Sequence, residues 1–224
     1  MISQLNELIN FAESNDMKIN KDKTTVMLFN RSKTMDFQPI VQMDNQVLNV
    51  VEETKLLGVM ISSDLKWKKH IQFVKKKFSK KLWALKRMRE IGATDDEMLE
   101  VYKLQIRCLT EIGCAAWNGS LTVKDRDELE RTQKTALRII LGHRYSGYEN
   151  ALDKLKISKL SDRREKICFK FAKKLEKNKK FDNWLIKAQV KTRSDTKYIT
   201  PKTRTTTYLK SPLYYLANIL NKNS

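Results

Sequence analysis

The sequence predicts a mainly α-helical protein with an α+β segment at its start, and three observations lead to this prediction. Glycine and proline are scarce, with 6 and 3 among 224 residues, which argues against an all-β sandwich. Short β-branched, apolar runs occur before Trp67. From Trp67 nearly to the end, apolar residues recur at helical spacing. We therefore expect a helix plus a small antiparallel sheet over residues 1–66, an all-α helical bundle over 67–192, and a polar connector with a short C-terminal helix over 193–224.

The first 66 residues are expected to begin with an amphipathic helix that ends at Asn15-Asp16. A strand is predicted over residues 24–29, and a hairpin over residues 40–48 around a polar turn at 44–45. A further strand is predicted over residues 55–61, in which Gly58 marks a bend or a close approach of the backbone. None of these pieces makes a complete sheet, so this segment is interpreted as a remnant.

The bundle is expected to open with a long helix that follows Trp67 and stops at Gly92, with Trp67 and Trp83 as core anchors. A second helix is predicted to start at a capping box and to run, apolar on several sides, to about Ile112. The later elements are expected to be a helix over 129–140 ended by Gly142, a helix over 160–175, and an apolar segment over 213–220 that docks on the bundle.

The charge balance indicates a polyanionic partner. The chain has 45 Lys and Arg against 26 Asp and Glu, a formal net charge of +19 and a sequence pI near 9.8. Nucleic acid is the most common partner of such a surface. No run approaches the roughly 18 uncharged apolar residues of a membrane-spanning helix, and the N-terminus has neither the basic nor the apolar region of a signal peptide.

The cysteines and histidines indicate a reducing compartment and no metal site. Cys108, Cys114 and Cys168 lie in apolar helical contexts and are odd in number, so we expect reduced thiols, with Cys108 and Cys114 buried, in the nucleus or the cytoplasm. His70 and His143 are too few to complete a Cys/His zinc site, and each is expected to pack or to cap a helix.

The first long helix carries the strongest functional signal. Residues 66–90 contain eleven Lys and Arg and the single acid Glu90. A helix face that is only solvated usually mixes charge signs, whereas like charges one turn apart repel. A phosphate backbone would neutralise this repulsion, so nucleic-acid contact is favoured, and a plain solvated face remains the alternative. The candidate contacts are Lys68, Lys69, Lys75, Lys76, Lys80 and Lys81.

Asp95 and Asp96 are the acidic pair that most resembles a two-metal catalytic site. Polymerases place such a pair on a tight turn between apolar strands, where both carboxylates reach one metal site. Here the pair lies between two helical patterns, after Gly92 and inside a Thr94-to-Glu97 capping box. We interpret it as part of a helix cap, and we predict no catalytic metal site.

The order of these pieces resembles the reverse transcriptase, an RNA-directed DNA polymerase, of non-LTR retrotransposons of the jockey-like lineages. The resemblance covers nearly the whole chain. Its carriers are Leu5-x-x-Leu8, Asn15-x-Met17-Lys18-Ile19-Asn20-x-x-Lys23-Thr24-x-x-Met27-x-Phe29, Lys55-Leu56-Leu57-Gly58-Val59-x-Ile61-x-x-Asp64-x-x-Trp67-x-x-His70-Ile71, Leu129-Glu130-Arg131-Thr132-Gln133-Lys134-x-Ala136-Leu137-Arg138-Ile139-Ile140-x-Gly142 with Tyr148, Leu160-x-x-Arg163-Arg164, and Arg204 with Tyr208-x-x-Ser211-Pro212-Leu213-x-Tyr215-Leu216.

The resemblance implies that residues 1–66 are the end of a palm and that the bundle is a thumb. Leu56, Leu57 and Gly58 would be the primer-grip hairpin, and Lys23 would match the palm lysine proposed to protonate the departing pyrophosphate, although an exposed turn lysine is an equal alternative. The lysines of the first thumb helix would hold an RNA–DNA hybrid or duplex.

The family's fingers and catalytic aspartates do not appear in this sequence. The chain alone is therefore expected to be inactive and to need no cofactor; magnesium is expected only for the complete polymerase, whose missing portion would lie on a separate or lost reading frame. The alternatives are a free-standing basic helical nucleic-acid-binding module and a decayed element product with no cellular role.

Overall fold

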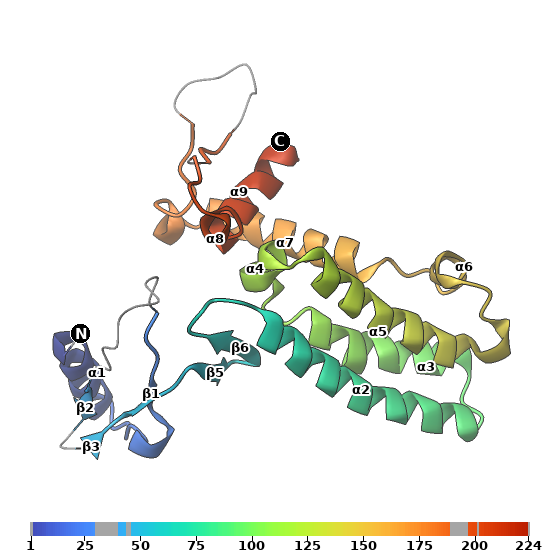
Figure 1. Ribbon diagram of the computed structural model, residues 1–224, viewed down its shortest axis with the longest axis horizontal. Helices are drawn as coiled ribbons and strands as arrows, with labels where there is room; N and C mark the ends of the chain where they lie inside the picture. The colour runs from blue at the N-terminus through green and yellow to red at the C-terminus, as the bar shows by residue number, and fades with distance from the viewer. Residues whose placement is uncertain (1, 30–39, 44–45, 189–196, 201, 224) are drawn as a thin grey trace. The chain divides into compact units, whose positions relative to one another are not determined.

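The computed structural model describes the chain except residues 1, 30–39, 44–45, 189–196, 201 and 224. The chain divides into two compact units, Met1–Lys66 and Trp67–Ser224. The first unit combines helix α1 with short strands and the second is built of helices (Figure 1). The predicted mainly α fold with an N-terminal α+β part is confirmed. The second unit also contains the described residues of the C-terminal segment.

The described residues of the first unit form three small two-stranded sheets. Two are antiparallel, β2 with β3 and β5 with β6, as expected, whereas β1 and β4 pair in parallel. The predicted strand over 24–29 is confirmed for two residues. The described elements of the first unit are α1 (Ile2–Ser14), η1 (Lys21–Lys23), β1 (Thr25–Val26), β2 (Gln42–Met43), β3 (Gln46–Val47), β4 (Asn49–Val50), β5 (Glu53–Leu56) and β6 (Val59–Ser62).

Two hairpins organise this unit. The predicted hairpin over 40–48 is confirmed, with its turn at 44–45 outside the described residues. The single strand predicted over 55–61 is instead the hairpin β5–β6. Leu57 and Gly58, with φ of 47° and 89°, form its two-residue turn. Two successive positive φ angles match the right-handed twist of paired strands, so Gly58 marks a tight turn and not a bend within one strand.

The first unit buries little apolar surface. Its core cluster is Val41, Met43 and Leu48, with partly buried residues of α1 packed against it. Large apolar side chains lie outside this cluster; Phe11 is 59% exposed and Leu57 is 92% exposed. So small a core contributes little hydrophobic stabilisation, because that stabilisation scales with the apolar area removed from water.

The second unit is a helical bundle in which α5 packs against both α2 and α7, and α7 packs against α4 and α9 (Figure 1). One of its core clusters includes Phe78 and Leu85 of α2 and Leu137 and Ile140 of α5. The elements are α2 (Lys68–Glu90), α3 (Asp95–Val101), η2 (Tyr102–Ile106), η3 (Arg107–Thr110), α4 (Cys114–Trp117), η4 (Asn118–Ser120), α5 (Val123–Leu141), η5 (Gly142–Arg144), α6 (Tyr148–Lys154), α7 (Leu160–Lys177), η6 (Lys179–Phe181), α8 (Thr206–Leu209) and α9 (Pro212–Lys222).

The helix predicted to run from the capping box to Ile112 is not continuous. After α3 it widens into the π-helical η2 and then tightens into the 3-10 turn η3. The wider turn changes which side chains face inward. Tyr102 and Ile106 are fully buried, whereas Leu104 is 67% exposed, so one side of the segment faces solvent.

The apolar C-terminal segment docks on the bundle as expected. α9 packs against α7 and α4 and buries Leu216, Ile219 and Leu220. The amide of Asn118 donates a hydrogen bond of 2.7 Å to the hydroxyl of Tyr215. A Cβ atom at Gly119 would lie 2.5 Å from the ring of Tyr215, so glycine is required for this close approach.

Across the described part of the chain, no helix is both long enough and apolar enough to cross a membrane.

Candidate nucleic-acid interface

Helix α2 separates an apolar face from a basic face. Ile71, Val74, Phe78 and Leu85 are at most 2% exposed and form the inner face. Their spacing of three, four and seven residues is that of one helical stripe. The helix ends before Gly92, whose φ of 83° confirms the predicted stop. The lysines between the apolar positions therefore point away from the core.

The six candidate lysines have different surroundings. Lys68, Lys69, Lys76 and Lys80 are exposed. Lys75 is half-buried, and its ammonium group lies 2.7 Å from the carboxylate of Glu128 on α5. Lys81 is exposed but donates a hydrogen bond of 3.2 Å to the side chain of Gln105. These two lysines help to hold the bundle together, so they are poorer candidates for phosphate contacts than Lys76 and Lys80.

Aromatic rings lie among the basic side chains of α2. Trp83 is 62% exposed, so the expectation that it is a core anchor is wrong. It follows Lys80 by three residues and Lys76 by seven, which places it on their face of the helix and not on the apolar stripe beside it. The guanidinium of Arg87 lies 5.3 Å from the Trp83 ring, and the ammonium of Lys77 lies 4.6 Å from the Phe73 ring. Both are cation–π contacts at the surface.

His70 is the buried titratable group of α2. Its ring lies edge-on to Trp67 at 6.1 Å and next to Trp117 at 5.1 Å. Desolvation by burial lowers its pKa from 6.5 to about 4. The imidazole is therefore neutral near pH 7 and packs in the core, as predicted, without adding to the positive charge of the helix. His143 is exposed in η5, just after α5.

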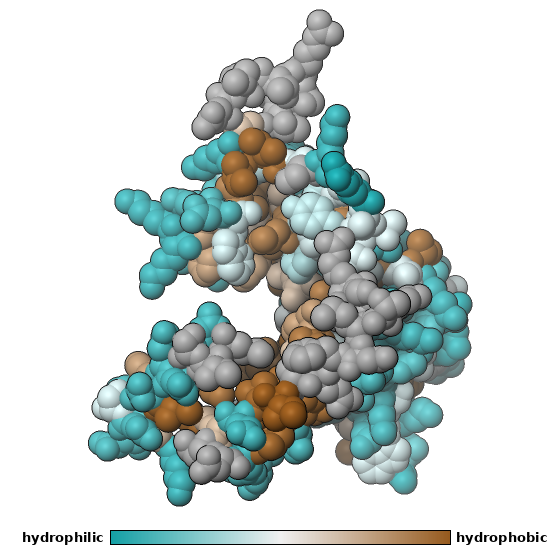
Figure 2. Space-filling view, turned by 60° about the vertical axis from the view of Figure 1, so that its left-hand side comes forward, coloured by the Kyte–Doolittle hydropathy of each residue, from teal (hydrophilic) through white to brown (hydrophobic). Residues whose placement is uncertain are grey.

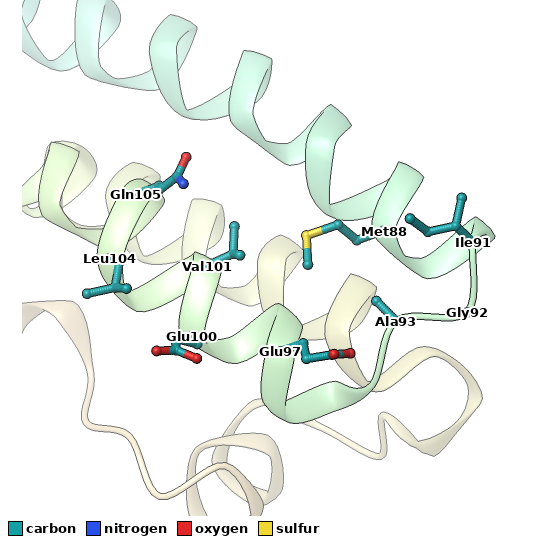
Figure 3. A pocket seen from close by; sticks show the side chains of 9 residues that line it. All are labelled: Met88, Ile91, Gly92, Ala93, Glu97, Glu100, Val101, Leu104 and Gln105. Carbon is teal, nitrogen blue, oxygen red and sulfur yellow. The ribbon is translucent and has the colours of Figure 1, made fainter.

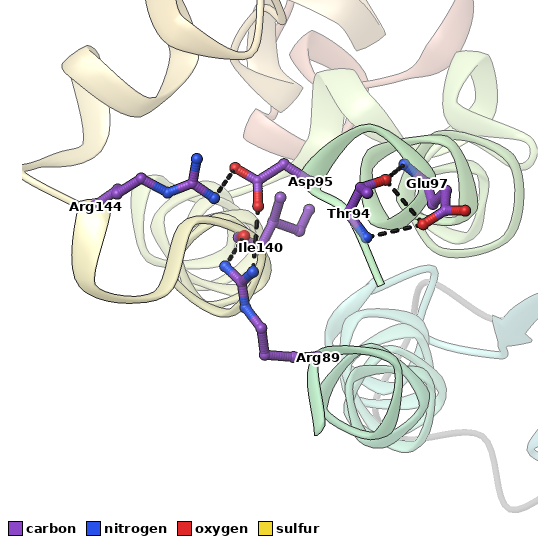
Figure 4. A network of polar contacts seen from close by, with 6 residues as sticks. All are labelled: Arg89, Thr94, Asp95, Glu97, Ile140 and Arg144. Atoms are coloured by element: carbon purple, nitrogen blue, oxygen red, sulfur yellow. Dashed lines mark hydrogen bonds and ion pairs between the residues drawn. The ribbon is translucent and has the colours of Figure 1, made fainter. Parts of the chain in front are cut away.

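The acidic pair after Gly92 belongs to a helix cap. Thr94 and Glu97 form the predicted capping box, in which the Glu97 carboxylate accepts hydrogen bonds of 2.8 Å from both the backbone N–H and the hydroxyl of Thr94 (Figure 4). Asp95 pairs with Arg89 at 3.3 Å and with Arg144 at 2.6 Å. Asp96 is exposed in the first helical turn. The Asp95 carboxylate thus links the end of α2 and the segment after α5 to the start of α3.

A groove at the end of α2 has the wrong charge for nucleic acid. It has a volume of about 610 Å³ and is lined by the apolar side chains of Met88, Ile91, Val101 and Leu104, with carboxylates at Glu97 and Glu100 (Figure 3). Carboxylates repel a phosphate backbone. Hydrophilic side chains otherwise cover much of the surface in the space-filling view, with smaller hydrophobic patches between them (Figure 2).

The residues matched to the polymerase palm lie in the first unit. Leu56 and Leu57 are exposed at the tip of the β5–β6 hairpin, beside Gly58. The non-glycine residue Leu57 adopts a left-handed conformation, which is costly and is imposed by the hairpin turn. Lys23 ends η1 with an exposed side chain, and its backbone N–H donates to the Asn20 side chain at 3.1 Å. This is the position of an exposed turn lysine before a strand.

Two of the three cysteines form a buried pair of thiols. The sulfur atoms of Cys114 and Cys168 lie 3.9 Å apart, and both residues are buried. A hydrogen bond with Cys114 and burial raise the pKa of the Cys168 thiol, so it is protonated near pH 7. Cys108 is only half-buried, contrary to expectation, because it lies in the distorted segment η3. Within the described ranges, no three His, Cys, Asp or Glu side chains come together as metal ligands would.

Comparison of the chain with protein-family models, with curated protein sequences and with solved structures gives no match.

Proposed function

We propose that this protein binds double-stranded nucleic acid along α2, as the duplex-holding C-terminal part of an RNA-directed DNA polymerase of the non-LTR retrotransposon type. The observation that carries the proposal is the outer face of α2. Lys68, Lys76 and Lys80 are exposed there beside the exposed Trp83. The single acid of the helix, Glu90, pairs with Arg87 at 2.6 Å.

The physical argument is electrostatic. Ten Lys and Arg on one helix raise its free energy through mutual repulsion, which duplex phosphates would relieve. Such contacts position a duplex without reading its bases, so sequence preference should be slight. Lysine contacts to phosphates also release counterions, which makes the affinity fall steeply with salt.

A free-standing basic module of different ancestry is the second candidate, because the α2 face does not depend on a polymerase origin. The two candidates differ in the genomic sequence upstream of Met1. An in-frame or frameshifted aromatic-x-Asp-Asp block there supports the polymerase origin, and unrelated sequence favours the free-standing module.

The direct test is a fluorescence-anisotropy titration of duplex DNA at several salt concentrations. We expect the triple variant Lys68→Gln, Lys76→Gln, Lys80→Gln to flatten the slope of log K against log salt by about 2–3, since each phosphate contact contributes about 0.9. The matched control replaces the exposed Lys124, Lys154 and Lys156 with glutamine, which removes the same charge elsewhere in the bundle. Equal slopes in the two triple variants would show that α2 does not contact the nucleic acid.

The same titration with an RNA–DNA hybrid tests the thumb assignment. A thumb grips a wide, shallow minor groove, so the hybrid should bind at least as tightly as B-form DNA. Clearly weaker binding of the hybrid would leave nucleic-acid binding in place and contradict the polymerase origin.

The variant Trp83→Ala tests the contribution of the aromatic ring to binding separately from that of the charges. Trp83→Ala should weaken binding by about tenfold, the order of one aromatic contact with a base or sugar, while the salt slope stays unchanged. Tyr208→Ala is the control, because this ring is 48% exposed on α8 and belongs to neither basic helix. Unchanged affinity in Trp83→Ala would show that the ring does not touch the nucleic acid.

A further inference from the structure

The C-terminal half of α7 carries a second basic surface that the sequence analysis did not single out. Residues 166–180 contain seven lysines and the single acid Glu176. Lys166, Lys170, Lys174 and Lys177 are exposed and recur at steps of four and three, which places them along one side of the helix. We call these four lysines the α7 face. In the described part of the chain, none of the four has an acidic side chain within ion-pair distance.

The acid of this stretch is already neutralised. Glu176 accepts a hydrogen bond from the ammonium of Lys197, and its other oxygen lies 3.4 Å from Lys173. The hydrogen bond from Lys197 lowers the pKa of Glu176 to about 2, so the carboxylate stays charged and paired at every physiological pH. It cannot balance the lysines of the α7 face.

Exposed aromatic rings lie near these lysines in the sequence. Phe171 on α7 is 42% exposed, and Trp184, after η6, is 51% exposed and packs edge-on to Phe181 at 4.8 Å. Exposed rings next to basic side chains suit nucleic acid, because every base offers a face for stacking. The α7 segment thus repeats the combination of lysines and an exposed tryptophan seen on α2.

A membrane surface fits this helix less well. A helix that lies in a membrane interface buries its apolar face in the lipid. The apolar side of α7, which includes Cys168, Ala172 and Leu175, is instead buried in the bundle. What α7 offers to a partner is its charged side, which suits a phosphate backbone.

The two basic faces lie on helices that α5 separates. α5 packs against both α2 and α7, and the two helices lie on opposite sides of it (Figure 1). Each buries its apolar stripe in the bundle, so the lysines of each helix lie on its outer side. We propose that the α7 face is a second nucleic-acid-binding site, through which one chain holds two separate nucleic-acid segments; the two-segment statement rests on the proposed function of α2.

The test uses the full chain and two short duplex DNAs. One duplex is immobilised at low density, protein is bound to it, and retention of a second, fluorescent duplex is measured. Wild type should retain the second duplex. The variant Lys166→Gln, Lys170→Gln, Lys174→Gln, Lys177→Gln should still bind the first duplex but retain about tenfold less of the second, because about four phosphate contacts are lost.

Controls separate folding and self-association from binding. Glutamine keeps a helix propensity close to that of lysine, so far-UV circular dichroism and the thermal midpoint should match those of wild type. The control with glutamine at Lys124, Lys154 and Lys156 should retain the second duplex normally. If two chains associated and each bound one duplex through α2, the pair would also retain the second duplex, and the α7 lysines would not be needed. Undiminished retention by the α7 variant therefore overturns the proposal.

The remaining outcomes are also decisive. Wild type that never retains a second duplex overturns the proposal. If the α7 variant loses even the first duplex while the α2 triple variant behaves as wild type, the proposed function of α2 fails and α7 is the nucleic-acid site. If the α7 variant loses binding to vesicles of phosphatidylserine and phosphatidylcholine but retains the second duplex, the face is a membrane surface and the proposal is wrong.

Discussion

Helices α2 and α5 pack against each other and have similar lengths, 23 and 19 residues, yet they use charge differently. On α5, five basic and four acidic residues are mixed along the helix. Several of these acids have a structural partner: Asp125 completes a capping box with Thr122, Glu128 pairs with Lys75, and Glu130 accepts a hydrogen bond from Tyr148. On α2, ten basic residues face a single acid.

The difference shows what an amphipathic helix of this bundle needs. α5 is folded and packed with its charges balanced, so an excess of one sign is not required for folding. The excess on α2 lies mostly on the exposed side, where among the described residues Lys68, Lys76 and Lys80 have no acidic side chain within ion-pair distance. We therefore assign the charges of α5 mainly to structure and the outer charges of α2 to a partner.

The largest expected effect concerns the inner face of α2. The pKa of His70 is lowered from 6.5 to about 4, so between these pH values the unfolded chain binds a proton that the folded chain does not. Stability should therefore fall as the pH drops from 7 to 4, with His70 contributing about 3 kcal/mol of this loss. Urea unfolding of His70→Phe should show a flatter pH dependence. His143→Gln, at an exposed site, should match wild type, and an equally steep loss in His70→Phe would contradict the assignment.

The second prediction compares one glutamine on each helix. Gln133 of α5 is fully buried and binds the hydroxyls of Tyr102 and Tyr148 and, at 3.1 Å, the carbonyl of Ser158. Gln133→Ala leaves these groups without their partner and should cost about 2 kcal/mol in urea unfolding. Gln72→Ala, on the exposed side of α2, should stay within about 0.5 kcal/mol of wild type. Similar losses in both variants would remove the contrast between the helices.

The smallest effect concerns the ion pair that joins the two helices. A hydrogen bond from Lys75 lowers the pKa of Glu128, so the pair stabilises the fold above the ordinary pKa of a glutamate and is lost as the pH falls. Because both side chains are partly exposed, Glu128→Gln should cost only about 0.5 kcal/mol at pH 7. A double-mutant cycle with Lys75→Gln measures the coupling. Asp127→Asn, exposed on the same helix, is the control and should show no coupling to Lys75.

The local pattern of the sequence was enough to predict most helices and their ends. Gly92 and the Thr94–Glu97 box mark the boundary between α2 and α3 because backbone conformation and capping are decided within a few residues. The apolar stripe of α2 was likewise predicted from its spacing, since burial on a helix follows a period of 3.6 residues.

Errors arose where the outcome depended on residues distant in the chain. The error at Trp83 had a local cause instead: hydrophobicity suggested a core anchor, but its helical spacing from the neighbouring lysines puts it on their face. The change from α3 to η2 brings Tyr102 to Gln133, a contact across 31 residues that no local pattern contains. The parallel pairing of β1 with β4 also joins distant segments.

By itself, the sequence determined the helical periods, the caps, the excess of positive charge and hence the basic helix, because propensity and net charge are local or additive properties. The tertiary structure alone decided which of these charges are paired within the protein and which remain available to a binding partner. It pairs Lys75 with Glu128 and Glu176 with Lys173 and Lys197, and it leaves Lys76, Lys80 and the α7 face exposed. The physical reason is that an ion pair needs two side chains within about 4 Å, and only the packed bundle sets that distance.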